Sequence, residues 1–277
     1  MQEDKIKYTI TPPRGLISIN LEELYRYKEL LYIFVWRDIK VRYKQTAIGI
    51  LWAILQPLLA MVIFSVFFGR LAKVPSDGVP YPIFVYVGLL LWNYYSTGLT
   101  SSSNCLIENE SIIKKVYFPR IILPISANAT PLVDFFFSFI VLIGLMFYYH
   151  YTPHLIGVLL LPVLLIVSLL SSAGLGLFLS AANAKYRDVK YVVPFFVQLL
   201  MYVTPVIYPA SIIPSSYQWI AFINPMAGVI TIARNSILGT ASIDYYLLLS
   251  TFVISALIFI FGIMYFRRTE RFFADVL

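Results

Sequence analysis

The sequence is short of cysteine, histidine and charge, and each shortage excludes a class of structure or chemistry. Its single cysteine, Cys105, cannot form an internal disulfide. Its two histidines, His150 and His154, bracket a proline turn, where solvated imidazoles are expected rather than a metal pair. The chain has no Gly-Lys pair, and therefore no P-loop, and it has no Gly-x-Ser-x-Gly elbow. Neither nucleotide binding by a P-loop nor catalysis by a serine elbow is available to it.

Hydrophobic residues dominate the composition instead. They make up 60% of the 277 residues, charged residues make up 13%, and the mean hydropathy is +0.80. This composition predicts an all-α integral membrane protein, in which each span needs about 20 mainly apolar residues. Six transmembrane helices are expected at residues 48–68, 83–104, 131–149, 155–182, 192–208 and 245–266. They form a domain at 48–266, between a cytoplasmic N-terminal segment at 1–47 and a short cytoplasmic tail at 267–277.

The basic residues predict the orientation of these spans. All of the 21 lysines and arginines except Arg70, Lys73 and Arg234 lie before the first span, between spans two and three, between spans four and five, or after the last. Cytoplasmic flanks of spans are enriched in these residues, so both termini are expected in the cytoplasm. The net charge of +7 therefore reflects topology and does not indicate a nucleic-acid partner.

Two segments outside the spans are too apolar for free loops. Residues 20–45 begin with Asn20 and Glu23 in a capping-box-like pattern and carry clustered aromatics, which favours a helix in the cytoplasmic interface over a solvated one. Residues 209–240 are apolar, but Pro214, Pro225 and Gly228 divide them into pieces too short to span. We expect a re-entrant pair of helices on the outer side, between the fifth and sixth spans, with a loop in the interface as the alternative.

Asp134 is the one carboxylate placed within a predicted span. An intramembrane acid is a candidate functional residue by default. It lies only three residues after Pro131, however, so it can sit near the cytoplasmic interface and pair with a basic residue or cap the helix. We expect this structural role rather than a proton relay.

Two helical stripes combine aromatic rings with one amide each. The first contains Gly49, Trp52, Gln56, Ala60 and Phe67, and the second contains Tyr191, Phe195, Gln198, Tyr202 and Pro205. An amide facing lipid would be unpaired at a cost of several kcal/mol, so both stripes should face protein or water. They suit sugar rings and also ordinary helix packing. Other aromatics, among them Trp92, Tyr94 and Tyr95, are expected in the interfacial belts.

The connection between spans two and three is a charged, amphipathic stretch. Ile112, Ile113, Val116 and Tyr117 fall on one apolar helical face, and Pro119 ends the helix. Glu110 near its start and the two lysines Lys114 and Lys115 near its end suit the helix dipole.

Four motifs together resemble the membrane subunit of ABC-2 type exporters, and most closely the permeases that handle O-antigen, capsule and teichoic acid chains. They are WRDIKVRYKQTAIGILWAILQPLL at 36–59, KKVYFPRIILP at 114–124, YVTPVIYP at 202–209 and INPMAGVITIARNSILG at 223–239. The resemblance implies a homodimer in the bacterial inner membrane that binds two separate ATP-binding cassette subunits. The partner subunits would hold ATP and magnesium, and this chain would hold no cofactor and no metal. The substrate would be a polysaccharide on a polyprenyl diphosphate.

The resemblance also assigns roles to particular residues. Contacts with the ATPase are expected at Glu108, Glu110, Ile112, Ile113, Lys114, Lys115, Val116, Tyr117, Arg187 and Asp188. The substrate path is expected at Trp52, Gln56, Phe67, Phe195, Gln198 and Tyr202. The lipid diphosphate and the interface are assigned to Arg37, Lys40, Arg42 and Lys44. An outer gate is assigned to Tyr217, Trp219, Asn224, Pro225 and Arg234.

Three other functions remain open from the sequence. An ABC-2 exporter of a drug or another lipid would have the same architecture. An ion-driven flippase would need several intramembrane ionisable residues, and only Asp134 is a candidate. A membrane-embedded glycosyltransferase would need acidic residues near the cytoplasmic face, where Glu108 and Glu110 are the only close pair in a loop between spans.

Overall fold

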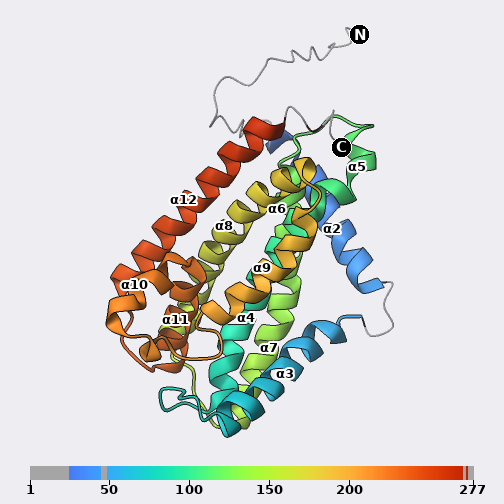
Figure 1. Ribbon diagram of the computed structural model, residues 1–277. Helices are drawn as coiled ribbons and strands as arrows, with labels where there is room; N and C mark the ends of the chain where they lie inside the picture. The colour runs from blue at the N-terminus through green and yellow to red at the C-terminus, as the bar shows by residue number, and fades with distance from the viewer. Residues whose placement is uncertain (1–24, 45–48, 271–272, 274–277) are drawn as a thin grey trace, which may run out of the picture.

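The computed structural model describes residues 25–44, 49–270 and 273, and all regular structure within this part of the chain is helical (Figure 1). The expected helix start at Asn20 lies outside the described residues. The α-helices are α2 (Lys28–Lys44), α3 (Leu51–Phe64), α4 (Tyr81–Glu108), α5 (Glu110–Ile113), α6 (Ile122–Ala129), α7 (Pro131–Tyr148), α8 (Leu155–Lys185), α9 (Val189–Val203), α10 (Ser215–Ile223), α11 (Pro225–Leu238) and α12 (Tyr245–Glu270). A π-helix, η1 (Ser65–Leu71), continues α3, and a 3-10 turn, η2 (Ala210–Ile212), precedes α10.

Length and apolarity identify fewer membrane spans than the sequence predicted. Four helical stretches are long and apolar enough to cross a membrane: Leu51–Leu71, Ile122–Tyr148, Leu155–Lys185 and Tyr245–Glu270. A fifth is obtained if α10 and α11, which are bent by 111°, count as one broken span. The all-helical membrane fold is thus confirmed, whereas the count of six spans and the re-entrant form of α10 and α11 are not.

The two remaining predicted spans correspond to α4 and α9. Helix α4 is 28 residues long but carries many hydroxyl and amide side chains, which it can do because protein rather than lipid surrounds most of it. Helix α9 has 15 residues and ends at Val203. Beyond it, Thr204 and Pro205 begin an irregular segment that leads to η2.

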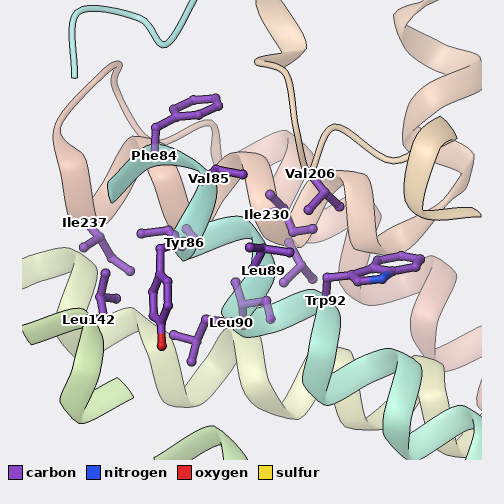
Figure 2. Packing of buried hydrophobic residues seen from close by; sticks show 14 of the residues in the cluster. Phe84, Val85, Tyr86, Leu89, Leu90, Trp92, Leu142, Val206, Ile230 and Ile237 are labelled. Atoms are coloured by element: carbon purple, nitrogen blue, oxygen red, sulfur yellow. The ribbon is translucent and has the colours of Figure 1, made fainter. Parts of the chain in front are cut away.

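Helix α4 is the centre of the core. Figure 2 shows its Phe84, Tyr86, Leu89 and Trp92 among side chains of α7, α11 and the segment that follows α9. Trp92, Tyr94 and Tyr95 are each at most 3% exposed, so their expected place in an interfacial belt is wrong. They are amphipathic residues that pack inside the bundle, because α4 is covered by other helices.

Helices α8 and α12 approach each other closely at two glycines. A Cβ atom on Gly262 would overlap the carbonyl group of Gly174, and a Cβ on Gly174 would lie 2.6 Å from the Cα of Phe259. Small residues at such crossings allow close backbone packing between membrane helices. A buried hydrogen-bond network joins α4, α6 and α8 nearby: Asn128 donates to Ser102 Oγ at 2.7 Å and accepts from Ser172 Oγ at 2.6 Å.

The elongated bundle has two distinct ends (Figure 1). At one end lie α5 and the last turns of α12, and we call this the α5 end. At the opposite end lie α10, α11 and the first turns of α12, and we call this the α10 end.

Candidate functional site

The charged connection at the α5 end is broken rather than one continuous helix. Helix α4 ends at Glu108, and the side chain of Asn109 donates to the carbonyl of Cys105 at 2.8 Å. Helix α5 is then a single turn. As a result the predicted apolar face is divided: Ile113 is buried, whereas Val116 and Tyr117 follow the turn with 58% and 70% of their surface exposed.

Charges from three elements meet around this turn. Lys114 Nζ pairs with Glu110 Oε1 at 2.5 Å, and this contact, with the charge of Arg187 nearby, lowers the pKa of Glu110. Burial raises the pKa of Glu108, and the carboxylate of Asp38 on α2 adds to the shift. Arg187, from the predicted connection between spans four and five, is thus close enough to Glu110 to affect its charge. Asp188 follows Arg187 and directly precedes α9. Lys115 is exposed beside them.

Helix α2 is fastened to the bundle by residues in its middle, Phe34 and Arg37. Its buried residue, Phe34, packs on Phe118 with ring centroids 5.6 Å apart. Arg37 donates to Asn109 Oδ1 at 2.7 Å and pairs with Asp38 at 2.7 Å. The exposed residues Tyr32, Ile33 and Trp36 point to an apolar outer face, in keeping with an interfacial helix.

Asp134 has a basic partner, as the sequence predicted. Arg42 Nη2 lies 2.6 Å from Asp134 Oδ2, and the hydroxyl of Tyr43 donates to Oδ1 of the same carboxylate. Of the four cations assigned to the lipid diphosphate, Arg37 and Arg42 therefore already have carboxylate partners. Lys40, which stacks on Trp36 at 5.0 Å, and Lys44 are both exposed.

A cavity of about 320 Å³ lies between α3, α4 and α7. Its lining combines Trp52 and Gln56 of α3 with Asn93 and Thr97 of α4. The other lining residues are Arg42, Tyr43, Gly49, Ala53, Pro57, Leu90, Tyr94, Asp134, Phe135 and Ser138. Two of the predicted path residues thus face a cavity within one subunit.

The other predicted path residues lie elsewhere. Phe195, Gln198 and Tyr202 form an exposed face of α9, which packs against α4 and α8. Phe67 is 57% exposed on the π-helix η1, away from the cavity lining. The described chain therefore separates the predicted path into a cavity on α3 and an exposed aromatic face on α9.

The predicted gate residues at the α10 end divide into an exposed and a buried group. Tyr217 and Trp219 on α10 are at least 60% exposed. Asn224 caps α11 by accepting from the amide of Met226 at 3.1 Å, and it donates to Thr204 Oγ1 at 2.7 Å. Pro225 is buried in the first turn of α11.

Arg234 is buried and holds the irregular segment that follows α9. Its guanidinium donates to the carbonyls of Phe84 at 3.1 Å, Pro205 at 2.6 Å and Tyr208 at 3.2 Å, and also to that of Val206. It lies over the Phe84 ring, 3.7 Å from the centroid. This irregular segment makes few backbone hydrogen bonds of its own. The N–H groups of the arginine side chain therefore donate to carbonyls that backbone amides would satisfy in a helix.

Sequence reasoning overlooked three residues that organise these sites. Asn109 ends α4, and Asn93 and Thr97 line the cavity. The signal for the last two was present, because Asn93, Thr97 and the lining residue Leu90 recur at helical spacing on one face of α4.

Comparison with known proteins gives consistent results. The family model described as ABC-2 type transporter matches residues 29–238. The O-antigen export system permease protein RfbA of Klebsiella pneumoniae is 30% identical over 250 residues, which cover 90% of this chain and 95% of that protein. A protein of the same name from Myxococcus xanthus is 32% identical over 214 residues, 76% of this chain and 81% of the relative. The polysialic acid transport protein KpsM of Escherichia coli is 25% identical over 210 residues, 73% and 78% of the two chains.

Proposed function

This chain belongs to the ABC-2 type transporter family, and from that premise we propose that it is the permease subunit of an ATP-driven polysaccharide exporter. The substrate is a polysaccharide linked to a polyprenyl diphosphate, moved from the cytoplasmic to the outer face of the bacterial inner membrane. The observation that carries this proposal is the similarity to O-antigen permeases along nearly the whole chain. A drug or simple lipid as cargo has no comparable support.

The α5 end is the surface proposed to bind the ATPase subunits. The sequence contains no P-loop, which supports the proposal that a separate subunit hydrolyses ATP. Val116 and Tyr117 provide exposed apolar surface there, and Lys115, Arg187 and Glu110 surround it with charge. A nucleotide-driven change in the ATPase can alter the permease only through contacts that differ between two states, and this surface offers such contacts.

The substrate path is proposed to lie between two copies of the chain. In the single subunit, Phe195, Gln198 and Tyr202 form an exposed face, and an exposed glutamine would be unpaired against lipid. A second copy, or a hydrated path between two copies, removes that cost. The exposed lysines Lys40 and Lys44 are proposed to meet the lipid diphosphate at the interface, and exposed Tyr217 and Trp219 are proposed to line the outer gate.

The proposal is tested in the host strain by deleting this chain alone. Polymer synthesis should continue while surface polymer, measured with a specific antibody or lectin, disappears and intracellular polymer accumulates. Re-expression of the chain should restore surface polymer only when the ATPase subunit can hydrolyse ATP. Normal surface polymer in the deletion strain would contradict the proposal, and altered drug resistance with normal polymer would favour another cargo.

A further inference from the structure

We propose that the cavity between α3, α4 and α7 binds one uncharged sugar ring of the lipid-linked glycan within each subunit. We call it the α3–α4–α7 cavity, and its lining is given above. This inference rests on the proposed function and names a second place for the substrate, apart from the path between two copies. It is argued from the hydrogen-bonding capacity, charge, position and size of the cavity.

Uncharged polar side chains without protein partners meet in this cavity. Gln56 of α3 and Asn93 and Thr97 of α4 line it, and within the described residues none of these side chains has a hydrogen-bond partner. Tyr94 also lines the cavity and is 2% exposed as a whole residue. Its buried hydroxyl has no hydrogen-bond partner in the described part of the chain. Gln56 is exposed and Asn93 and Thr97 are partly exposed, so their polar groups are open to an occupant of the cavity. An apolar occupant would remove these groups from water without pairing them, whereas a hydrogen-bonding occupant avoids that cost.

The helices point these groups toward one another. Asn93 and Thr97 are one turn apart on α4, so they share a face, and Trp52 and Gln56 are related in the same way on α3. An aromatic ring beside amides and a hydroxyl matches a sugar ring, which has an apolar C–H face and a rim of hydroxyls. Trp52 is 54% exposed and therefore has ring surface available for such a contact.

The charge of the cavity favours a neutral ligand over a phosphate. Its charged lining residues are Arg42 and Asp134, and these two neutralise each other at 2.6 Å. A phosphate would have to compete with the Asp134 carboxylate for the guanidinium. The remaining polar lining is composed of amides and hydroxyls, which suits hydroxyl groups of a sugar.

The position and size fit a sugar close to the lipid anchor. The cavity lies near the first turns of α3 and α7 and is bounded by the last residues of α2, the helix that carries Lys40 and Lys44. Its volume of about 320 Å³ is within the range of small-molecule sites, about 300–1,000 Å³. Lys44 shares the last turn of α2 with the lining residues Arg42 and Tyr43, so a diphosphate held at Lys44 would lie at the end of α2 that borders the cavity.

The experiment compares farnesyl diphosphate with farnesyl diphosphates that carry one neutral hexose or N-acetylhexosamine. Binding is measured on the full-length chain in lipid nanodiscs. We expect the best sugar to tighten binding at least tenfold in the wild type. Asn93→Leu and the near-isosteric Thr97→Val should each reduce this gain to less than threefold, while binding of plain farnesyl diphosphate stays within twofold of the wild type.

Thr100→Val is the matched control. It makes the same substitution on the same helix, but the Thr100 hydroxyl donates to the carbonyl of Ser96 at 2.8 Å and does not line the cavity. The sugar-dependent gain should be retained in this variant. A gain that is absent from the wild type, that persists in Asn93→Leu and Thr97→Val, or that is lost equally in Thr100→Val overturns the proposal.

The deletion strain and the binding measurement together separate this inference from the export function. If the deletion strain keeps normal surface polymer while the sugar-dependent gain is found, the export function fails and the site stands. If surface polymer depends on the chain but no sugar adds to binding, the cavity holds only water and the site is rejected.

Discussion

Arg42 at the end of α2 and Asp134 in the first turn of α7 form an ion pair, with Nη2 2.6 Å from Oδ2. The hydroxyl of Tyr43 donates to the same carboxylate. The pair joins the basic N-terminal helix to a membrane-spanning stretch that lies about 90 residues further along the chain. These partners satisfy a carboxylate in the first turn of α7, in line with the structural role that the sequence predicted for Asp134.

Removing one partner of this pair should destabilise the fold moderately. The side chains of Arg42 and Asp134 are 37% and 19% exposed, between a surface pair and a buried one. We therefore expect Asp134→Asn to cost about 1–2 kcal/mol, seen as a lower unfolding temperature in detergent. Exchanging the two residues, Arg42→Asp with Asp134→Arg, should recover part of the loss. No recovery would mean that Tyr43 rather than Arg42 provides the stabilisation.

Arg234 should be among the least replaceable residues of the α10 end. Arg234→Met removes the donors from three buried carbonyls and one partly buried carbonyl, so we expect the free energy of unfolding to fall by at least about 3 kcal/mol. Arg234→Lys should recover little of it, because an ammonium group cannot reproduce the planar fork. The exposed Arg70, also predicted on the outer side, is the control: Arg70→Met should change stability by less than about 0.5 kcal/mol.

A substitution at Val116 should test the ATPase-binding surface proposed at the α5 end without disturbing the core. Val116→Asp places a charge on a side chain that is 58% exposed, so the protein should fold and still assemble with the proposed ATPase subunit. We expect ATP hydrolysis to continue and export of polymer to fall at least tenfold. Val116→Thr, which keeps the shape of the side chain, should retain most export. Wild-type export by Val116→Asp would remove this residue from the contact. Ile113→Asp is not suitable for this test, because Ile113 is buried.

Glu108 and Glu110 should affect stability with opposite dependence on pH. The pKa of Glu108 is raised, mainly by burial, from its ordinary value of 4.5, so its favourable contribution is complete below that value and is lost as pH rises. The pKa of Glu110 is lowered by Lys114, so its contribution is present at neutral pH and is lost as pH falls. At pH 7 Glu108→Gln should raise the unfolding temperature and Glu110→Gln should lower it. Both differences should shrink at pH 4, and equal signs at pH 7 would contradict these assignments.

Gly262 should tolerate no side chain, in contrast to Gly144. A Cβ at Gly262 would overlap the carbonyl group of Gly174 where α12 crosses α8, whereas a Cβ at Gly144 meets nothing within 4 Å. Gly262→Ala should therefore destabilise the protein by about 2 kcal/mol or more, because two backbones must separate. Gly144→Ala should be neutral or stabilising by up to about 1 kcal/mol, since alanine favours the helix. Thermal unfolding of the two variants checks the contrast, which would fail if both behaved alike.

The predictions from the sequence succeeded where a local property was sufficient. Apolar length predicted the all-helical membrane fold, and four motifs predicted the transporter family. The position of Asp134 close to Pro131 predicted its pairing with a basic residue, although many basic residues were available and the sequence could not choose Arg42.

The predictions failed where packing decides. The sequence predicts Tyr94 and Trp92 in an interfacial aromatic belt. Both are buried instead, because other helices enclose α4 and these amphipathic side chains pack in the core. The face formed by Ile113 and Val116 was predicted on a continuous helix, but α5 is a single turn that ends at Ile113, so Val116 lies beyond it.

By itself the sequence determined the class of the protein and its expected topology, because hydropathy, basic residues and short motifs are properties of short segments. Only the tertiary structure decided which polar groups are paired. It enclosed Arg234 in backbone carbonyls, joined Arg42 to Asp134, and left Gln56, Asn93 and Thr97 facing a cavity. Each outcome depends on contacts between helices distant in sequence, since a polar side chain in a membrane is defined by the partner that the fold provides.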